Sequence, residues 1–156
     1  MTGMVTTTDL ILAAPELLIT LTGLVVLLLG LALRRRNPGW LAGVSLLGTV
    51  GALSLVIWQA VYQVPGVAFS GLHVVDDYAG FFKVVFLLSA AIVILLSVRF
   101  LVEHGLDAGE FYSILLFGTL GTMLMASAVD LLSLFVGLET MAVCTYVLCG
   151  ILKRDQ

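Results

Sequence analysis

Charged side chains are scarce in this sequence. They make up 11% of its 156 residues, whereas 61% are hydrophobic, and the mean hydropathy is +1.19. Soluble domains carry roughly 25% charged residues. Runs of about 18 or more nearly uncharged residues recur along the chain, and each is long enough to cross the hydrocarbon core of a bilayer. The composition therefore excludes an ordinary soluble domain and predicts an integral membrane protein.

Several patterns that carry chemistry elsewhere do not occur. The sequence has no GxxxxGK[ST] loop, no GxGxxG after a strand and no Ser or Cys placed near a His in a nucleophile pattern. Its two cysteines, Cys144 and Cys149, form neither a CxxC motif nor a metal site, so we expect thiols packed among helices. A net charge of −3 without a basic, aromatic-flanked cluster indicates no nucleic-acid partner. We expect this chain to bind no metal and no cofactor.

Long apolar runs are what the sequence does contain. They predict an all-α, polytopic bundle of transmembrane helices that forms a single domain over residues 1–156. The five predicted spans cover about residues 15–33, 39–62, 78–101, 110–128 and 130–152. The N-terminus lacks the basic region of a secretory signal, so we expect no cleavage there.

The connections between spans are short. Residues 64–77 form the sizeable one, which suits a surface loop or a short hairpin. Val129 and Asp130 leave room only for a tight turn, so the last two spans should be antiparallel neighbours. Gly39 and Gly43 have a GxxxG spacing, a weak signal for close helix approach.

Basic residues predict the orientation, because short cytoplasmic loops are enriched in Lys and Arg. With five alternating spans, six of the seven basic residues fall on one side. These six are Arg34, Arg35, Arg36, Arg99, Lys153 and Arg154. That side is predicted to be the cytoplasm and to hold the C-terminus, whereas the N-terminus and residues 64–77 lie outside.

Glu139 is the candidate for chemistry. It lies about nine residues into the fifth span, which at 1.5 Å per residue is roughly 14 Å deep, near the midplane. An acid there raises the apparent cost of insertion by about 2.5 to 3.5 kcal/mol, so it should face a protein interior or a hydrated path. It could handle protons, or it could be a neutral carboxyl that hydrogen-bonds across helices. Tyr146, seven residues on, would continue a polar stripe or simply pack.

Other polar residues have plainer interpretations. Lys83 is close enough to the outer end of the third span to reach the interface by snorkelling. His73 and His104 are isolated, so we expect solvated loop histidines. Small and hydroxylated residues of the fourth span, including Thr119 and Thr122, should pack closely on the fifth span, or should line a water path to Glu139.

Four segments together resemble a known family. PELL opens the first span, VVDDYAGFFKVVFLL leads the third, GEFYSILLFGTLGTMLMASAVDLLSLFVGLE joins the last two, and YVLCGILKRD ends the chain. Over about residues 15–155 they resemble the N-terminal portion of subunit N of proton-pumping NADH:quinone oxidoreductase, respiratory complex I. This family is related to Mrp-type cation/proton antiporter subunits, and Glu139 matches its fifth-helix glutamate. Cys144 departs from the proline that many members carry there.

The resemblance implies a role for the chain. It would be the N-terminal part of a longer, antiporter-like subunit in a bacterial inner membrane, among the other membrane subunits of complex I. Peripheral subunits would oxidise NADH and pass electrons to quinone. Glu139 would relay protons, paired with a lysine beyond this sequence. The chain alone should then be inactive as an enzyme. The alternatives are a scaffold that helps assembly without transport, or a subunit of an Mrp-type antiporter or a membrane-bound hydrogenase.

Overall fold

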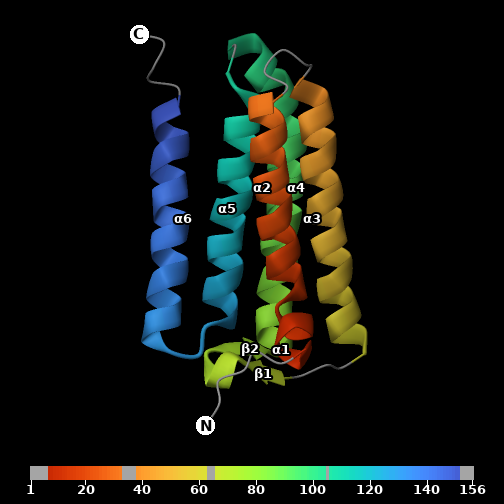
Figure 1. Ribbon diagram of the computed structural model, residues 1–156, viewed down its shortest axis with the longest axis vertical. Helices are drawn as coiled ribbons and strands as arrows, with labels where there is room; N and C mark the ends of the chain where they lie inside the picture. The colour runs from red at the N-terminus through yellow and green to blue at the C-terminus, as the bar shows by residue number, and fades with distance from the viewer. Residues whose placement is uncertain (1–6, 33–37, 63–65, 105, 152–156) are drawn as a thin grey trace.

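Five long helices stand side by side in a computed structural model that describes residues 7–32, 38–62, 66–104 and 106–151 (Figure 1). They are α2 (Ala14–Ala32), α3 (Pro38–Val61), α4 (Asp77–His104), α5 (Ala108–Ser127) and α6 (Leu131–Ile151). Each contains a segment long and apolar enough to cross a membrane. The five predicted spans and the all-α class are therefore confirmed. The predicted ends at residues 33 and 152 lie outside the described residues.

Aspartates begin three of these helices. Asp76, Asp107 and Asp130 each accept a hydrogen bond from a backbone N–H two or three residues further on, at 2.7 to 2.9 Å. Each side chain thus satisfies a donor that the first helical turn leaves without a partner. The turn before α6, residues 128–130, is one residue longer than predicted. α5 and α6 are antiparallel neighbours, as predicted (Figure 1).

One helix is longer than predicted. α4 continues to His104 rather than ending near residue 101, which makes it 28 residues long, or about 42 Å at the standard rise. Its last turns carry an ion pair between Arg99 and Glu103 at 2.7 Å, together with a contact between the tilted rings of Phe100 and His104. These contacts between residues four apart extend the helix past its apolar part.

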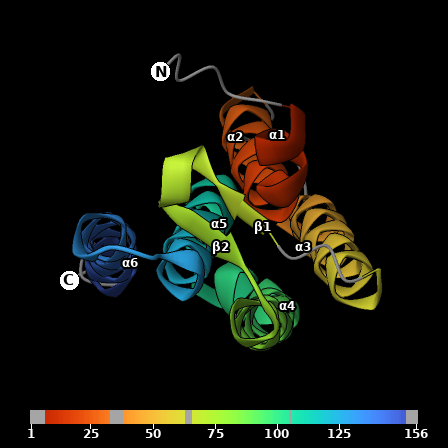
Figure 2. The same ribbon diagram turned by 90° about the horizontal axis from the view of Figure 1, so that it is seen from below.

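α5 is the central helix and α6 the peripheral one. α5 contacts each of the other four long helices, whereas α6 stands at the edge of the bundle beside α5 (Figure 2). Within α6 only Gly137 is buried. One face of α6 is therefore packed, and most of its surface is left uncovered by the rest of the described chain.

Glycines allow the closest helix contacts. A Cβ on Gly30 of α2 would lie 2.6 Å from the Cα of Gly109 on α5, and one on Gly121 of α5 would lie 2.8 Å from the carbonyl oxygen of Gly137 on α6. Backbones can approach this closely only where no side chain intervenes. The GxxxG residues Gly39 and Gly43 do not mark such a contact, since a Cβ on either would meet nothing described within 4 Å.

A small hairpin closes the end of the bundle where α4 begins. β1 (Gly66–Ala68) pairs antiparallel with β2 (His73–Val75), and a 3₁₀ turn, η1 (Phe69–Gly71), joins them. Of the two structures predicted for residues 64–77, a surface loop or a short hairpin, the described residues 66–75 form the hairpin. Phe69 has φ of 53°, in the left-handed region that side chains other than glycine rarely adopt.

A short helix that was not predicted, α1 (Thr7–Leu12), packs beside the hairpin (Figure 2). The carboxylate of Asp9 accepts a hydrogen bond from the backbone N–H of Phe69 at 3.2 Å. The amide of Gln59 on α3 donates to the carbonyl oxygens of Ile11 and Leu12 at 2.9 and 3.2 Å. Because its partners are about 50 to 60 residues away, local sequence could not reveal this helix.

Candidate functional site

A buried ion pair joins the first turn of α2 to α4. The Nζ atom of Lys83 lies 2.6 Å from Oε1 of Glu16, and the two residues are 1% and 4% exposed. The prediction that Lys83 reaches the membrane interface is therefore wrong. α4 is rotated so that Lys83 points into the bundle, and a carboxylate there neutralises its charge, which removes the need to snorkel.

His73 lies beside this pair. Its Nε2 atom is 3.8 Å from Oε1 of Glu16, and its ring packs edge-on against Phe69. The residue is 7% exposed, so the prediction of a solvated loop histidine is wrong, because β2 folds inward over the helix ends. Burial lowers the pKa of His73, the Glu16 carboxylate raises it, and the Lys83 ammonium lowers it; the net direction is down.

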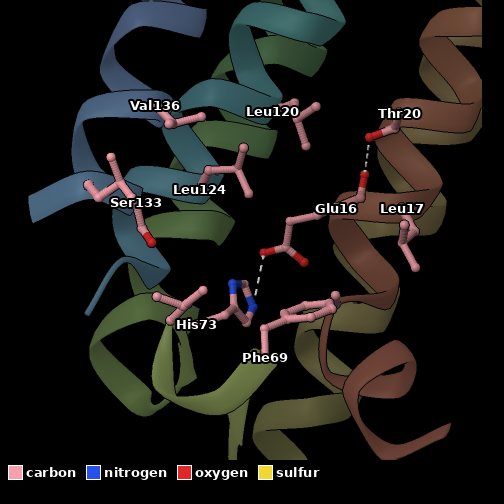
Figure 3. Close-up of a pocket in the computed structure, with 12 residues that line it drawn as sticks. Glu16, Leu17, Thr20, Phe69, His73, Leu120, Leu124, Ser133 and Val136 are labelled. Carbon is pink, nitrogen blue, oxygen red and sulfur yellow. Dashed lines mark hydrogen bonds and ion pairs between the residues drawn. The ribbon is translucent and has the colours of Figure 1, made fainter. Parts of the chain in front are cut away.

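The cluster borders a cavity of about 440 Å³. Figure 3 shows Glu16 and His73 at one side of it, opposite Leu120 and Leu124 of α5 and Val136 of α6. Oε2 of Glu16 and Nε2 of His73 have no hydrogen-bond partner among the described atoms. The site is thus polar on one side, apolar on the other, and not saturated with hydrogen bonds.

The lowered pKa of His73 predicts how stability depends on pH. A histidine whose pKa is lower in the folded chain than its ordinary 6.5 binds more protons when unfolded, so stability rises with pH across that interval. We expect thermal stability in detergent to be constant above about pH 6.5, to fall as pH drops towards the folded-state pKa, and then to level off. His73→Gln should flatten this profile. His104→Gln should not, because His104 is exposed; equal effects of the two variants would argue against the assignment.

Glu139 is not part of this cluster. It lies on the exposed surface of α6, and it forms no ion pair or side-chain hydrogen bond with any described residue. Tyr146 is also exposed, at 74%. The hydroxyls of Thr119 and Thr122 donate to carbonyl oxygens of α5 itself. The close packing predicted between the last two spans occurs at Gly121 and Gly137.

The two cysteines and His104 lie apart from the cluster of Glu16, Lys83 and His73. Cys144 is half-buried near Gly118 of α5, whereas Cys149 is exposed, so only one of the two thiols packs within the described bundle. His104 is exposed, as predicted, and its Nδ1 atom is 3.0 Å from the carbonyl oxygen of Phe100.

Glu16 is the residue that sequence reasoning missed. A signal was available: the first and third spans run in the same direction, and Glu16 and Lys83 both lie near their starts. Opposite charges at similar depth in parallel spans can pair if the helices adjoin. Such proximity does not follow from the sequence, and neither does the inward fold of His73.

Comparisons with known proteins agree with the fold. No protein-family model matches the chain. It is 43% identical to NADH-quinone oxidoreductase subunit N 1 of Koribacter versatilis over 95% of its length, and 38% identical to subunit N of Trichlorobacter lovleyi over 96%. A chain of respiratory complex I from Thermus thermophilus, solved with bound aureothin, superposes with a TM-score of 0.69 at 27% identity, over 86% of this chain and 28% of that one.

These similarities cover only part of the relatives. The chain spans about 30% of the length of the two subunits named above. These similarities, together with five apolar helices of spanning length, show that this is a multi-pass membrane protein. The chain is therefore related to NADH-quinone oxidoreductase subunit N and corresponds to about 30% of that subunit's length.

Proposed function

We propose that this chain is part of a proton-translocating membrane subunit of an NADH:quinone oxidoreductase, with Glu139 as its proton-relay acid. The observation that carries the proposal is the 43% identity to a subunit N over 95% of the chain, combined with a single acid in the middle of the apolar helix α6. NADH oxidation and quinone reduction would take place in other subunits, which this chain would contact within the membrane.

The surroundings of Glu139 support a role that needs more protein than this chain. A carboxylate at this depth is tolerated where it meets a cation, another polar group or water. The buried cation of the described bundle, Lys83, is already paired with Glu16. We infer that the uncovered face of α6 packs against further helices of the complete subunit, and that one of them supplies the counter-charge.

A relay follows from elementary electrostatics. A nearby cation stabilises the ionised carboxylate, and its withdrawal favours the protonated form. A conformational change elsewhere in the complex that moves the cation would thus protonate and deprotonate Glu139. The function is to couple quinone reduction elsewhere to the movement of protons through the membrane interior.

We further propose a bacterial inner-membrane location, with the N-terminus and the hairpin in the periplasm and the C-terminus in the cytoplasm. The hairpin and the end of α4 that carries Arg99 lie at opposite ends of the bundle (Figure 1), which agrees with an excess of basic residues on the cytoplasmic side. Five of the basic residues behind this orientation, Arg34, Arg35, Arg36, Lys153 and Arg154, lie outside the described residues.

The test is Glu139→Gln in the complete complex in liposomes. General acid–base groups contribute on the order of 10² to 10⁴ in proton-transfer rate, so we expect transfer through this subunit to fall by at least about a hundredfold. NADH:quinone reductase activity should persist, and the number of protons moved per quinone reduced should drop.

Glu110→Gln is the matched control, because Glu110 is an exposed acid in the first turn of α5. It should leave pumping unchanged. Undiminished pumping by Glu139→Gln at normal reductase activity would remove Glu139 from the relay. Impaired assembly of that variant with normal pumping by the complexes that do form would favour the scaffold alternative.

A further inference from the structure

The Glu16 carboxylate contacts a charged side chain of the described residues through only one of its oxygen atoms. Its Oε1 atom contacts Lys83 at 2.6 Å and lies 3.8 Å from Nε2 of His73, whereas Oε2 has no hydrogen-bond partner among the described atoms. Nε2 of His73 has none either. Both side chains are more than nine-tenths buried. Buried polar atoms without a protein partner are commonly satisfied by water where there is room for it.

The adjacent cavity provides that room. Its volume of about 440 Å³ is many times the roughly 30 Å³ that one water molecule occupies in the liquid. The hydroxyl groups of Thr20 and Ser133 are further polar groups in the lining of this cavity (Figure 3). Leu17 and Leu132, which also line it, are 48% and 69% exposed, so the cavity reaches the surface of the bundle near its hairpin end.

We propose that Glu16, Lys83 and His73 form a proton-binding site separate from Glu139, in which His73 exchanges a proton with water that enters this cavity from the hairpin end of the bundle. A proton delivered by water adds to Nε2 of the neutral imidazole and converts it to imidazolium. The Glu16 carboxylate then lies between two cations. Lys83 is a positioning residue, because its ammonium group holds the Glu16 carboxylate in place through the 2.6 Å contact.

The charges around His73 agree with a reversible step. Glu16 faces it from α2 and Lys83 from α4, while α5 presents Leu120 and Leu124. The other acids at this end, Asp9, Asp76, Asp77 and Asp130, include three that accept hydrogen bonds from backbone N–H groups. Burial lowers the pKa of His73, the Glu16 carboxylate raises it and the Lys83 ammonium lowers it, so charges of both signs act on the imidazole.

The site is connected to α6 through backbone contacts. His73 forms a bridge with Ala128, and the N–H of Val129 donates to the carbonyl oxygen of Leu72 at 3.4 Å. Ala128 and Val129 are the first two residues of the turn, residues 128–130, that precedes α6. A change of charge at His73 therefore acts next to the turn that leads into the helix carrying Glu139.

Nitrogen NMR of the full chain in lipid bilayers tests the proposal directly. The sequence contains two histidines, His73 and His104, so ¹⁵N-histidine labelling yields one buried probe and one exposed internal control. Across about pH 4 to 9, which brackets the ordinary histidine range, His73 should titrate below the ordinary histidine pKa of 6.5.

Two variants should move the titration of His73 in opposite directions. Glu16→Gln removes the neighbouring carboxylate and should weaken proton binding at His73 by at least about tenfold; Lys83→Met removes the competing cation and should strengthen it by a similar factor. His104 should not change in either variant. The wild-type titration is decisive even if Lys83→Met does not fold.

Two results would overturn the proposal. His73 resonances that stay constant throughout the pH range would mean a static structural contact, and equal shifts of His73 in both variants would exclude control by the pair. Proton pumping is not part of the readout, so failure of the Glu139 proposal would leave this test intact, and the reverse also holds.

Discussion

Lys83→Met is expected to reduce the free energy of unfolding by about 3 to 5 kcal/mol, the usual result of removing one partner of a buried ion pair. The Glu16 carboxylate would remain 4% exposed without its ammonium partner. Reversible unfolding in mixed micelles, as a function of denaturing detergent, measures this loss. The effect is large because the carboxylate would lose the ammonium group that offsets the cost of keeping its charge in a low-dielectric interior.

Two variants separate the loss of the pair from other effects of the substitution. Glu16→Leu combined with Lys83→Met should restore most of the stability, because two apolar side chains of similar size leave no charge unpaired. Arg99→Met should change stability by no more than about 0.5 kcal/mol, because its partner Glu103 is half-exposed and four residues away on the same helix. Equal losses from Lys83→Met and Arg99→Met would contradict the buried pairing.

Gly121→Val is expected to separate α6 from α5. A Cβ at Gly121 would lie 2.7 Å from the backbone nitrogen of Met141 and 2.8 Å from the carbonyl oxygen of Gly137. Both atoms belong to the α6 backbone, which cannot turn aside as a flexible side chain can. Overpacking of this kind costs about 1 to 3 kcal/mol, or roughly 5- to 150-fold in the packing equilibrium.

A disulfide between the two helices measures that equilibrium. A Cβ at Gly118 would lie 3.3 Å from the Cβ of Cys144, close to the spacing of disulfide-bonded cysteines. In a Cys149→Ser background, Gly118→Cys should therefore cross-link to Cys144 under mild oxidation, and added Gly121→Val should suppress the product. Gly150→Val is the control, since a Cβ there meets nothing described within 4 Å. Undiminished cross-linking with Gly121→Val would show that α6 accommodates the side chain.

For Glu139, the sequence pattern predicts the position along the helix but not the side of the helix on which the residue lies. Its depth in the fifth span follows from counting residues at the helical rise, and the structure places it in α6 as expected. Which side of α6 it occupies does not follow. The packed side is determined by Gly121 and Gly137, where two backbones can meet, and Glu139 points away from the described bundle.

For Lys83, the sequence pattern does not predict the contacts with neighbouring segments. Its distance from the start of α4 made snorkelling inexpensive, but that estimate considers one helix in lipid and takes no account of its neighbours. A carboxylate from α2 and an imidazole from β2 approach it only after both segments are assembled. The same is true of α1, whose hydrogen-bond partners are Gln59 and Phe69.

The sequence by itself determined the membrane class, the five spans, the short turn before α6 and the position of Glu139 within its span, because each depends on the length and polarity of a single segment. Only the tertiary structure decided which helices adjoin, how each is rotated, and thus that Glu16, Lys83 and His73 meet. The physical reason is that helices in lipid are apolar on the sides that face lipid and on the sides that face protein. Their periodicity therefore does not mark a buried face, and rotation is determined by small-residue contacts and buried charges that come together only in the assembled bundle.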